Sequence, residues 1–332
     1  MKLLKLIPDN TNIQFLRLRV PFYIASLVLM ALSIGLVATK GLNLGVDFLG
    51  GQTIRTTFTQ SATAPIAQLR NEIGALGYGE PSIQTFGKAN EVSIRMKLPD
   101  GANADSGLAN KMASRITSEI KAKHPDARID GVDSVSGKVS GELGRSAALA
   151  LGLAALGVAA YIWIRFEWQF GVGALFALVH DVTLTLGMFA LTQMEFDLNI
   201  VAALLTLIGY SLNDTIVVYD RIRENLKKFR RMPIPELLDL SVNETLSRTI
   251  VTSLSLLITL LALLTLGPPV IFGFTAAITL GIFVGTYSSI YMAAPILIWL
   301  KINAASFVPE ETALERQDRL TREGGPAPAT RR

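Results

Sequence analysis

The chain has 332 residues, half of them hydrophobic and only 17% charged, and its mean hydropathy is +0.41. This balance is typical of an integral membrane protein and argues against a nucleic-acid partner, although the formal net charge is +4, because the basic residues lie beside apolar runs. The absence of cysteine excludes disulfides, thiol catalysis and zinc-cysteine sites, and two histidines in different regions, His124 and His180, predict no metal site.

The first apolar run, residues 20–39, contains no charged side chain and has the length of a membrane-spanning helix. Basic residues precede it, as in a signal peptide, but the run is longer than the hydrophobic region of a cleaved signal. We therefore expect residues 1–19 to form a cytoplasmic N-terminus and residues 20–39 to form a retained transmembrane helix.

The other five predicted spans lie within residues 146–300. After Arg248 no charged residue appears until Lys301, which leaves room for two spans joined by a turn at Gly267. We expect residues 301–332 to form a disordered cytoplasmic tail. The earlier three apolar runs cover residues 146–164, 168–194 and 198–219.

Charge in the short connecting segments indicates the orientation. The segment from Asp220 to Arg231, which we interpret as a loop, is mostly basic and is expected in the cytoplasm. Both termini are then cytoplasmic, and residues 40–145 lie on the periplasmic side.

Residues 40–145 predict a separate domain. Alternating apolar residues indicate strands near residues 53–58, 82–86, 91–97 and 129–135, and apolar stripes at helical spacing indicate helices beginning near Thr63 and after Asp105. The order strand, helix, strand, strand, helix, strand is that of an α+β ferredoxin-like domain with both helices on one face of an antiparallel sheet. Its acidic and basic residues nearly balance, which argues against a nucleic-acid surface. The core formed by two helices favours protein contact, with a passive spacer as the alternative.

Charged side chains inside apolar spans are costly and therefore mark candidate functional sites. Asp214, past the middle of the fourth span, is the leading candidate for a proton carrier, and the alternative is that Asn213 and Asp214 only tie helices together. Arg248 is either an interfacial anchor or a partner for ionised Asp214. His180 and Asp181 are possible supporting residues; since neighbouring helical residues point about 100° apart, we expect at most one to face a proton pathway.

Several strings in order along the chain resemble the SecF family of the SecD/SecF group. The resemblance spans roughly residues 10–305 and implies six transmembrane helices, similar to half of a resistance-nodulation-division transporter. The strings run from Gly45 to Gly51, Phe166 to Gly171, Val179 to Asp181, Ile208 to Val218, Asp220 to Asn225 and Ser247 to Thr249, followed by Thr252 and Ser253.

The resemblance also implies a function. Such a protein is a non-enzymatic subunit without cofactors that uses the proton motive force in the bacterial inner (cytoplasmic) membrane, in contact with lipid. With SecD and the Sec translocation channel it promotes movement of the translocating polypeptide. Asp214 and Arg248 fall where the family has its proton-pathway residues.

Three alternatives are weighed against this interpretation. Asp181 and Asp214 on successive spans are compatible with an intramembrane aspartyl protease, but the Gly-x-Gly-Asp sequence of one protease class is absent. A self-contained proton-coupled exporter of the resistance-nodulation-division type and a passive scaffold are the others. A six-span half with one small outer domain favours a partner-dependent unit.

Overall fold

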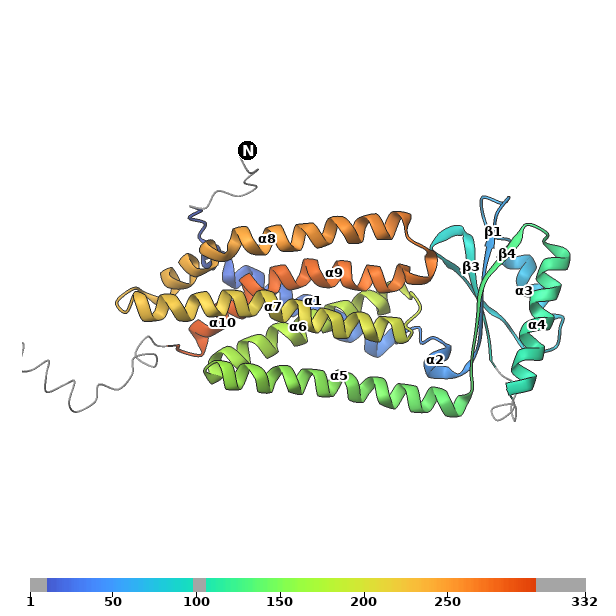
Figure 1. Ribbon diagram of the computed structural model, residues 1–332, viewed down its shortest axis with the longest axis horizontal. Coiled ribbons are helices and arrows are strands. Elements are labelled where there is room, and N and C mark those ends of the chain that lie inside the picture. Colours follow the sequence, from blue (N-terminus) through green and yellow to red (C-terminus); the bar gives the residue numbers. More distant parts are fainter. Residues whose placement is uncertain (1–10, 98–105, 303–332) are drawn as a thin grey trace, which may run out of the picture.

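The computed structural model describes residues 11–97 and 106–302, and it consists of a bundle of long helices with a small α+β domain at one end (Figure 1). The predicted disordered tail lies outside the described residues, apart from Lys301 and Ile302. The described ends of the chain, near Thr11 and Ile302, both lie at the end of the bundle away from the α+β domain (Figure 1).

Within these described ranges, six helical segments are long and apolar enough to cross a membrane, which confirms the predicted polytopic class. Five are the continuous or nearly continuous helices α1, α5, α6, α7 and α8; the sixth combines α9, a π-helical turn and α10. Their bounds are α1 Arg19–Lys40, preceded by a 3-10 turn at Phe15–Leu18, α5 Gly137–Arg165, α6 Trp168–Thr192, α7 Leu198–Lys228, α8 Ile234–Leu266, α9 Phe272–Ser288, the π turn Ser289–Ala293 and α10 Ala294–Trp299.

The expectation that Asp220 to Arg231 forms a loop is wrong, because α7 continues as a helix to Lys228. Its last turns keep an apolar stripe, in which Ile222 and Leu226 are fully buried in the same cluster as the first turns of α8. Most of the basic side chains therefore lie on the last turns of a helix, and the chain reverses direction only between α7 and α8.

The small α+β domain between α1 and α5, called the outer domain below, has the predicted ferredoxin-like fold. Its strands form one antiparallel sheet in the order β2-β3-β1-β4, in which Ile54 of β1 lies opposite Ile94 of β3 and Val132 of β4. Alternate residues of the strands and the apolar stripes of the two long helices form one buried core. The elements are a short helix α2 Val46–Leu49, β1 Gly51–Phe58, α3 Ile66–Gly74, β2 Ser82–Phe86, β3 Lys88–Met96, α4 Ser106–Lys123 and β4 Ala127–Val135.

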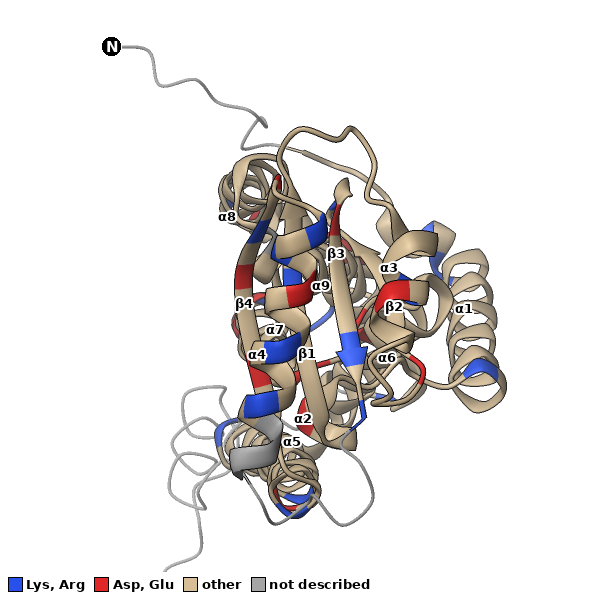
Figure 2. Cartoon of the chain, turned by 90° about the vertical axis from the view of Figure 1, so that its right-hand side faces the viewer, with Lys and Arg blue, Asp and Glu red and all other residues tan. Residues whose placement is uncertain are grey.

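The sheet lies between the helical bundle and the helices α3 and α4 (Figure 1). Since side chains alternate across a strand, the residues between the core positions, such as Arg55, Ser93 and Arg95, belong to the face away from α3 and α4. This second face is polar. Acidic and basic residues are interspersed over the outer domain and form no single-sign stripe (Figure 2).

The six spans of the described residues differ in burial: α6, α7 and the α9 span are the inner helices of the bundle, and α1, α5 and α8 are its outer helices. The most apolar windows of α6, α7 and the α9 span are 50%, 50% and 61% buried, against 17%, 11% and 17% for the spans of α1, α5 and α8. The outer helices turn large apolar side chains such as Leu153, Trp163 and Ile258 outward, as expected for helices in contact with lipid. Polar residues that are buried in the inner helices must therefore find partners within the protein.

Candidate functional site

A polar cluster lies at the centre of the bundle around Asp181 of α6. Both Asp181 and its neighbour His180 are fully buried, and His180 Nδ1 lies 2.9 Å from Asp181 Oδ1. Oδ2 of Asp181 accepts hydrogen bonds from Ser211 of α7 at 2.5 Å and from Ser288 of α9 at 2.9 Å. The two neighbours thus form one pair, and the carboxylate of Asp181 joins three inner helices.

Small residues let these helices approach closely enough for such contacts. A Cβ on Gly285 of α9 would lie 3.3 Å from Ser211 Cβ and 3.6 Å from Asp181 Oδ2. A Cβ on Gly281, one turn earlier, would lie 2.4 Å from the Leu207 side chain. Close packing of this kind is how helices associate in a membrane, where apolar side chains gain little by leaving lipid.

Asp214 lies on α7, one turn beyond Ser211, and its side chain is only 3% exposed. Among the described contacts it accepts one hydrogen bond, from Ser253 of α8, at the long distance of 3.5 Å. Ser253 also lies 3.0 Å from the hydroxyl of Tyr210 and 2.8 Å from that of Thr286. The carboxylate of Asp214 is therefore buried among hydroxyl groups and is held much less firmly than that of Asp181.

Arg248 and Asn213 both lie on the surface of this chain. Arg248 is exposed on α8, and the contacts of the described residues include no ion pair between it and Asp214, although it is near enough for its charge to act on the Asp214 carboxyl group. Asn213 is also exposed, although its neighbour Asp214 is buried. The structure thus brings together His180, Asp181 and the hydroxyl groups, and leaves the two predicted polar residues on the surface of this chain.

The serines of the cluster were missed by sequence reasoning. Hydroxyl residues in apolar helices usually bond to their own backbone, as Ser255 does to the Val251 carbonyl at 2.7 Å. Ser211 and Ser253 lie within strings that resemble the SecF family but were given no role, and nothing in the sequence distinguishes Ser288 from this ordinary case. In the described part of the chain, no group of three or more His, Cys, Asp or Glu side chains is arranged to hold a metal ion.

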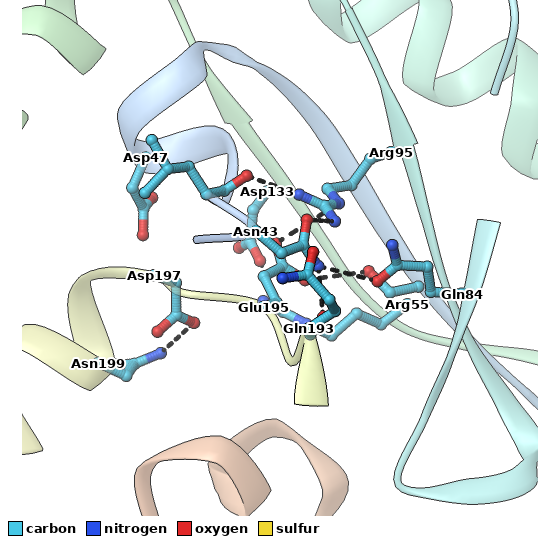
Figure 3. A network of polar contacts seen from close by, with 12 residues as sticks. Asn43, Asp47, Arg55, Gln84, Arg95, Asp133, Gln193, Glu195, Asp197 and Asn199 are labelled. Carbon is cyan, nitrogen blue, oxygen red and sulfur yellow. Dashed lines mark hydrogen bonds and ion pairs between the residues drawn. The ribbon is translucent and has the colours of Figure 1, made fainter. Parts of the chain in front are cut away.

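A second polar network joins the bundle to the outer domain (Figure 3). Its carboxylates Glu195 and Asp197 lie in the loop between α6 and α7, and burial raises the pKa of both above the usual range, against the opposing effect of Arg95 on Glu195. Gly45 lies against this loop so closely that a Cβ would be 3.1 Å from Glu195 Oε1.

Gly51 begins β1 with a φ of +127°, and a Cβ there would lie 2.5 Å from the Met96 carbonyl oxygen. A non-glycine residue at this position would meet both a strained backbone and a steric clash. Gly50 has a φ of +72° and lies close to Gly137, so the backbone requires glycine at positions 50 and 51, whereas at position 45 the closest contact of a Cβ would be the flexible end of the Glu195 side chain.

The fold and these two networks define a multi-pass membrane protein of the SecD/SecF export class. Residues 115–303 match the family model for the C-terminal part of the protein export membrane protein SecD/SecF, and residues 35–62 match the SecD/SecF GG motif. The second match contains Gly50 and Gly51, whose conformation and surroundings require glycine.

The chain belongs to the SecF family. It is 46% identical over 303 residues to the protein translocase subunit SecF of Cereibacter sphaeroides, covering 90% of this chain and 93% of the relative.

Solved structures of SecDF are also similar. The chain superposes on SecDF of Thermus thermophilus, described as a translocon-associated membrane protein, with a TM-score of 0.79 and 35% identity. The superposed region covers 89% of this chain and 40% of that one. With SecDF in a super-membrane-facing form the TM-score is 0.58 at 32% identity, over 95% and 40% of the two chains. The chain thus spans about 40% of the length of SecDF.

Proposed function

We propose that this chain is the SecF subunit of a proton-driven complex that works with SecD and the Sec channel to promote polypeptide export across the bacterial inner membrane. Its membership of the SecF family supports this role. The observation that supports proton coupling is the environment of Asp214. This residue is only 3% exposed in a spanning helix, and among the described contacts its carboxylate accepts a single long hydrogen bond. Such a group is able to change its protonation state without dismantling a tight network.

The exposed polar residues support a partner within the membrane. Asn213 and Arg248 belong to helices that span the membrane, yet both are exposed on this chain. A polar side chain facing lipid is unfavourable by a few kcal/mol, on the order of 2.5–3.5 kcal/mol for arginine at the helix centre. A second six-span subunit packed on α7 and α8 would cover them, which favours a SecD-dependent unit over a self-contained exporter.

The proposed orientation places both ends of the chain in the cytoplasm and the outer domain in the periplasm. Basic residues gather at the end of α7 and in the turn after it, at the end of the bundle away from the outer domain (Figure 1). Since the chain has no cysteine, single cysteines at Ser118 and Arg230 provide a direct test. In intact cells whose outer membrane has been made permeable, a membrane-impermeant maleimide should label only the cysteine at position 118.

The proton role is tested by export into inverted membrane vesicles that contain the partner subunits, with and without a proton gradient. Asp214→Asn should abolish the gradient-stimulated part of export and leave the remainder unchanged. Glu142→Gln, which removes an exposed carboxylate near the start of α5, is the matched control and should behave as wild type. Undiminished gradient stimulation in Asp214→Asn, at equal amounts of complex, would leave Asp214 as a structural residue.

A further inference from the structure

Arg95 of β3 connects the outer domain to the membrane part (Figure 3). Its guanidinium donates hydrogen bonds to the Leu44 carbonyl at 2.7 Å and to Asn43 Oδ1 at 2.6 Å, and its Nε lies 4.0 Å from Glu195 Oε1. The side chains of Arg95 and Glu195 are only 12% and 13% exposed. Hydrogen bonds from a charged donor in such surroundings are among the stronger polar contacts in proteins.

The groups that Arg95 contacts belong to one unit. The segment after α1 and the loop between α6 and α7 lie side by side, because Phe196 N donates to the Asn43 carbonyl and Gly45 N donates to the Phe196 carbonyl, both at 2.8 Å. Asn43 Nδ2 also donates to the Gln193 carbonyl at 2.7 Å. Any displacement of the loop therefore moves the partners of Arg95 together.

The same unit holds the first turn of α7. Leu198 N donates to Asp47 Oδ2 at 2.9 Å, and Ile200 N donates to Asp197 Oδ1 at 3.1 Å, which caps the helix. Asp214 lies further along this helix. Hydrogen bonds therefore run without a break from the first turn of α7 through this loop to Arg95 and the sheet.

Two cavities flank this connection and leave the outer domain room to move. One, of about 630 Å³, lies between the sheet and the outer ends of α7 and α9, and its lining includes Arg55, Phe86 and Phe272. The other, of about 640 Å³, is lined by residues that include Leu49, Tyr78 and Lys97. Arg95 lines the second cavity and its partner Glu195 the first. Two further hydrogen bonds link the sheet to the same segments, from Ser93 Oγ to Glu195 Oε2 at 3.3 Å and from Asn43 Nδ2 to Gln84 Oε1 at 3.0 Å.

The remaining covalent attachment runs from β4 into α5, the span with the smallest buried share. Such a helix is the least restrained by the bundle and can follow a movement of the domain.

We propose that Arg95 is a positioning residue that serves as the pivot of the outer domain and transmits displacements of α7 to it. It does so through its contacts with Asn43, Leu44 and Glu195. The inference rests on the proposed proton-driven function, because the displacement of α7 is the one that a change at Asp214 would produce.

The test measures the position of the outer domain directly. Spin labels on cysteines at Ser118 of α4 and Leu266 of α8, both exposed, report the distance between the domain and the bundle by electron-electron resonance in vesicles containing the complex. In the wild-type background this distance distribution should change when a proton gradient is imposed. In Arg95→Gln it should become broader and no longer respond, and gradient-stimulated export should fall to the level without a gradient.

Controls separate this role from simple folding. Arg115→Gln removes an exposed arginine of α4 and should leave both measurements unchanged. The exchange Arg95→Glu with Glu195→Arg restores opposite charges across the junction and should recover part of the gradient response, whereas either single change should not. An Arg95→Gln complex that keeps the wild-type distance change, or a wild type that shows none, would overturn the proposal.

The failure of this inference and that of the proposed function are distinguishable. If Asp214→Asn loses gradient-stimulated export while Arg95→Gln keeps it, the proton role stands and the pivot is wrong. If Asp214→Asn keeps it as well, the proposed proton role fails, and the pivot with it.

Discussion

Ser288 donates a 2.9 Å hydrogen bond to Asp181, and it is also the last residue of α9 before the helix changes to π geometry over Ser289–Ala293. Single π turns inside α-helices are uncommon and are frequent at functional sites. Pro295 follows in α10 and lacks a backbone donor, which also favours an irregular turn here. Asp181 is therefore hydrogen-bonded directly to the residue at which the helix geometry changes.

The first prediction concerns this contact. Ser288→Ala removes one of the two serine donors to a buried carboxylate and should lower the free energy of unfolding by about 1–3 kcal/mol. Its effect should shrink in an Asp181→Asn background, since an amide has less need of a donor. Thermal unfolding in detergent measures both. Ser255→Ala, which removes only a bond to the helix backbone, is the control, and equal losses in the two serine variants would contradict the prediction.

Arg248 should be important in the complex but not for the stability of the isolated chain. Because it is exposed and makes no ion pair with Asp214 here, Arg248→Ala should change the free energy of unfolding by no more than about 0.5 kcal/mol. In vesicles with the partner subunits the same variant should lose gradient-stimulated export. Full activity of Arg248→Ala together with normal assembly would identify the residue as an interfacial anchor.

Gly187 of α6 should tolerate no side chain. A Cβ at this position would lie 2.1 Å from Ser33 Oγ and 2.9 Å from the Ser33 Cα, so Gly187→Ala must push α1 away from α6. We expect a loss of about 1–3 kcal/mol, the usual range for overpacking. Gly157→Ala on α5, where nothing lies within 4 Å, is the matched control and should leave the melting temperature unchanged or raise it.

The stability contributed by the polar network between the bundle and the outer domain, which includes Glu195 and Asp197, should depend on pH. Because burial raises the pKa of Glu195 above its usual value of 4.5, the folded chain holds this proton more tightly than the unfolded chain does. Stability from this group is therefore greatest at or below pH 4.5 and declines as the pH rises through the raised value. Asp197 acts in the same direction.

Glu195→Gln should accordingly flatten the decline in melting temperature above pH 4.5. The charged groups that act on Glu195 are Arg95, Arg55 and Asp197, and all three remain in this variant. Glu142→Gln, outside this polar network, controls for the loss of a carboxylate. A Glu195→Gln curve parallel to that of wild type would show that the carboxylate is not desolvated in the folded chain.

The fold was predictable to the extent that local pattern determines it. Apolar runs identified all six spans, and alternation in residues 40–145 identified the four strands and two helices of the ferredoxin-like domain. The extent of α7 was not predicted, because a run of charged residues at a helix end resembles a loop when the apolar residues between them are sparse.

The site was predictable only in part. The burial of Asp214 follows from the cost of placing charge in lipid, but its partners do not, and neither does the burial of His180 and Asp181 together as one pair. Asp181 and Ser288 are 107 positions apart, and such pairs depend on how the helices are packed. The same holds for Arg95 and Glu195, and for the exposure of Asn213. The roles of Asp214 and Arg248 in proton transfer remain predictions.

The sheet order of the outer domain has a consequence for synthesis. β1 is a central strand, and one of its two neighbours is β4, which ends directly before α5 begins. Since the ribosome synthesises the chain from the N-terminus, β1 has one unpaired edge until β4 has been synthesised, which is directly before the second span. A nascent chain that pauses between α4 and β4 therefore carries an unpaired edge strand, which is the kind of surface on which chains aggregate.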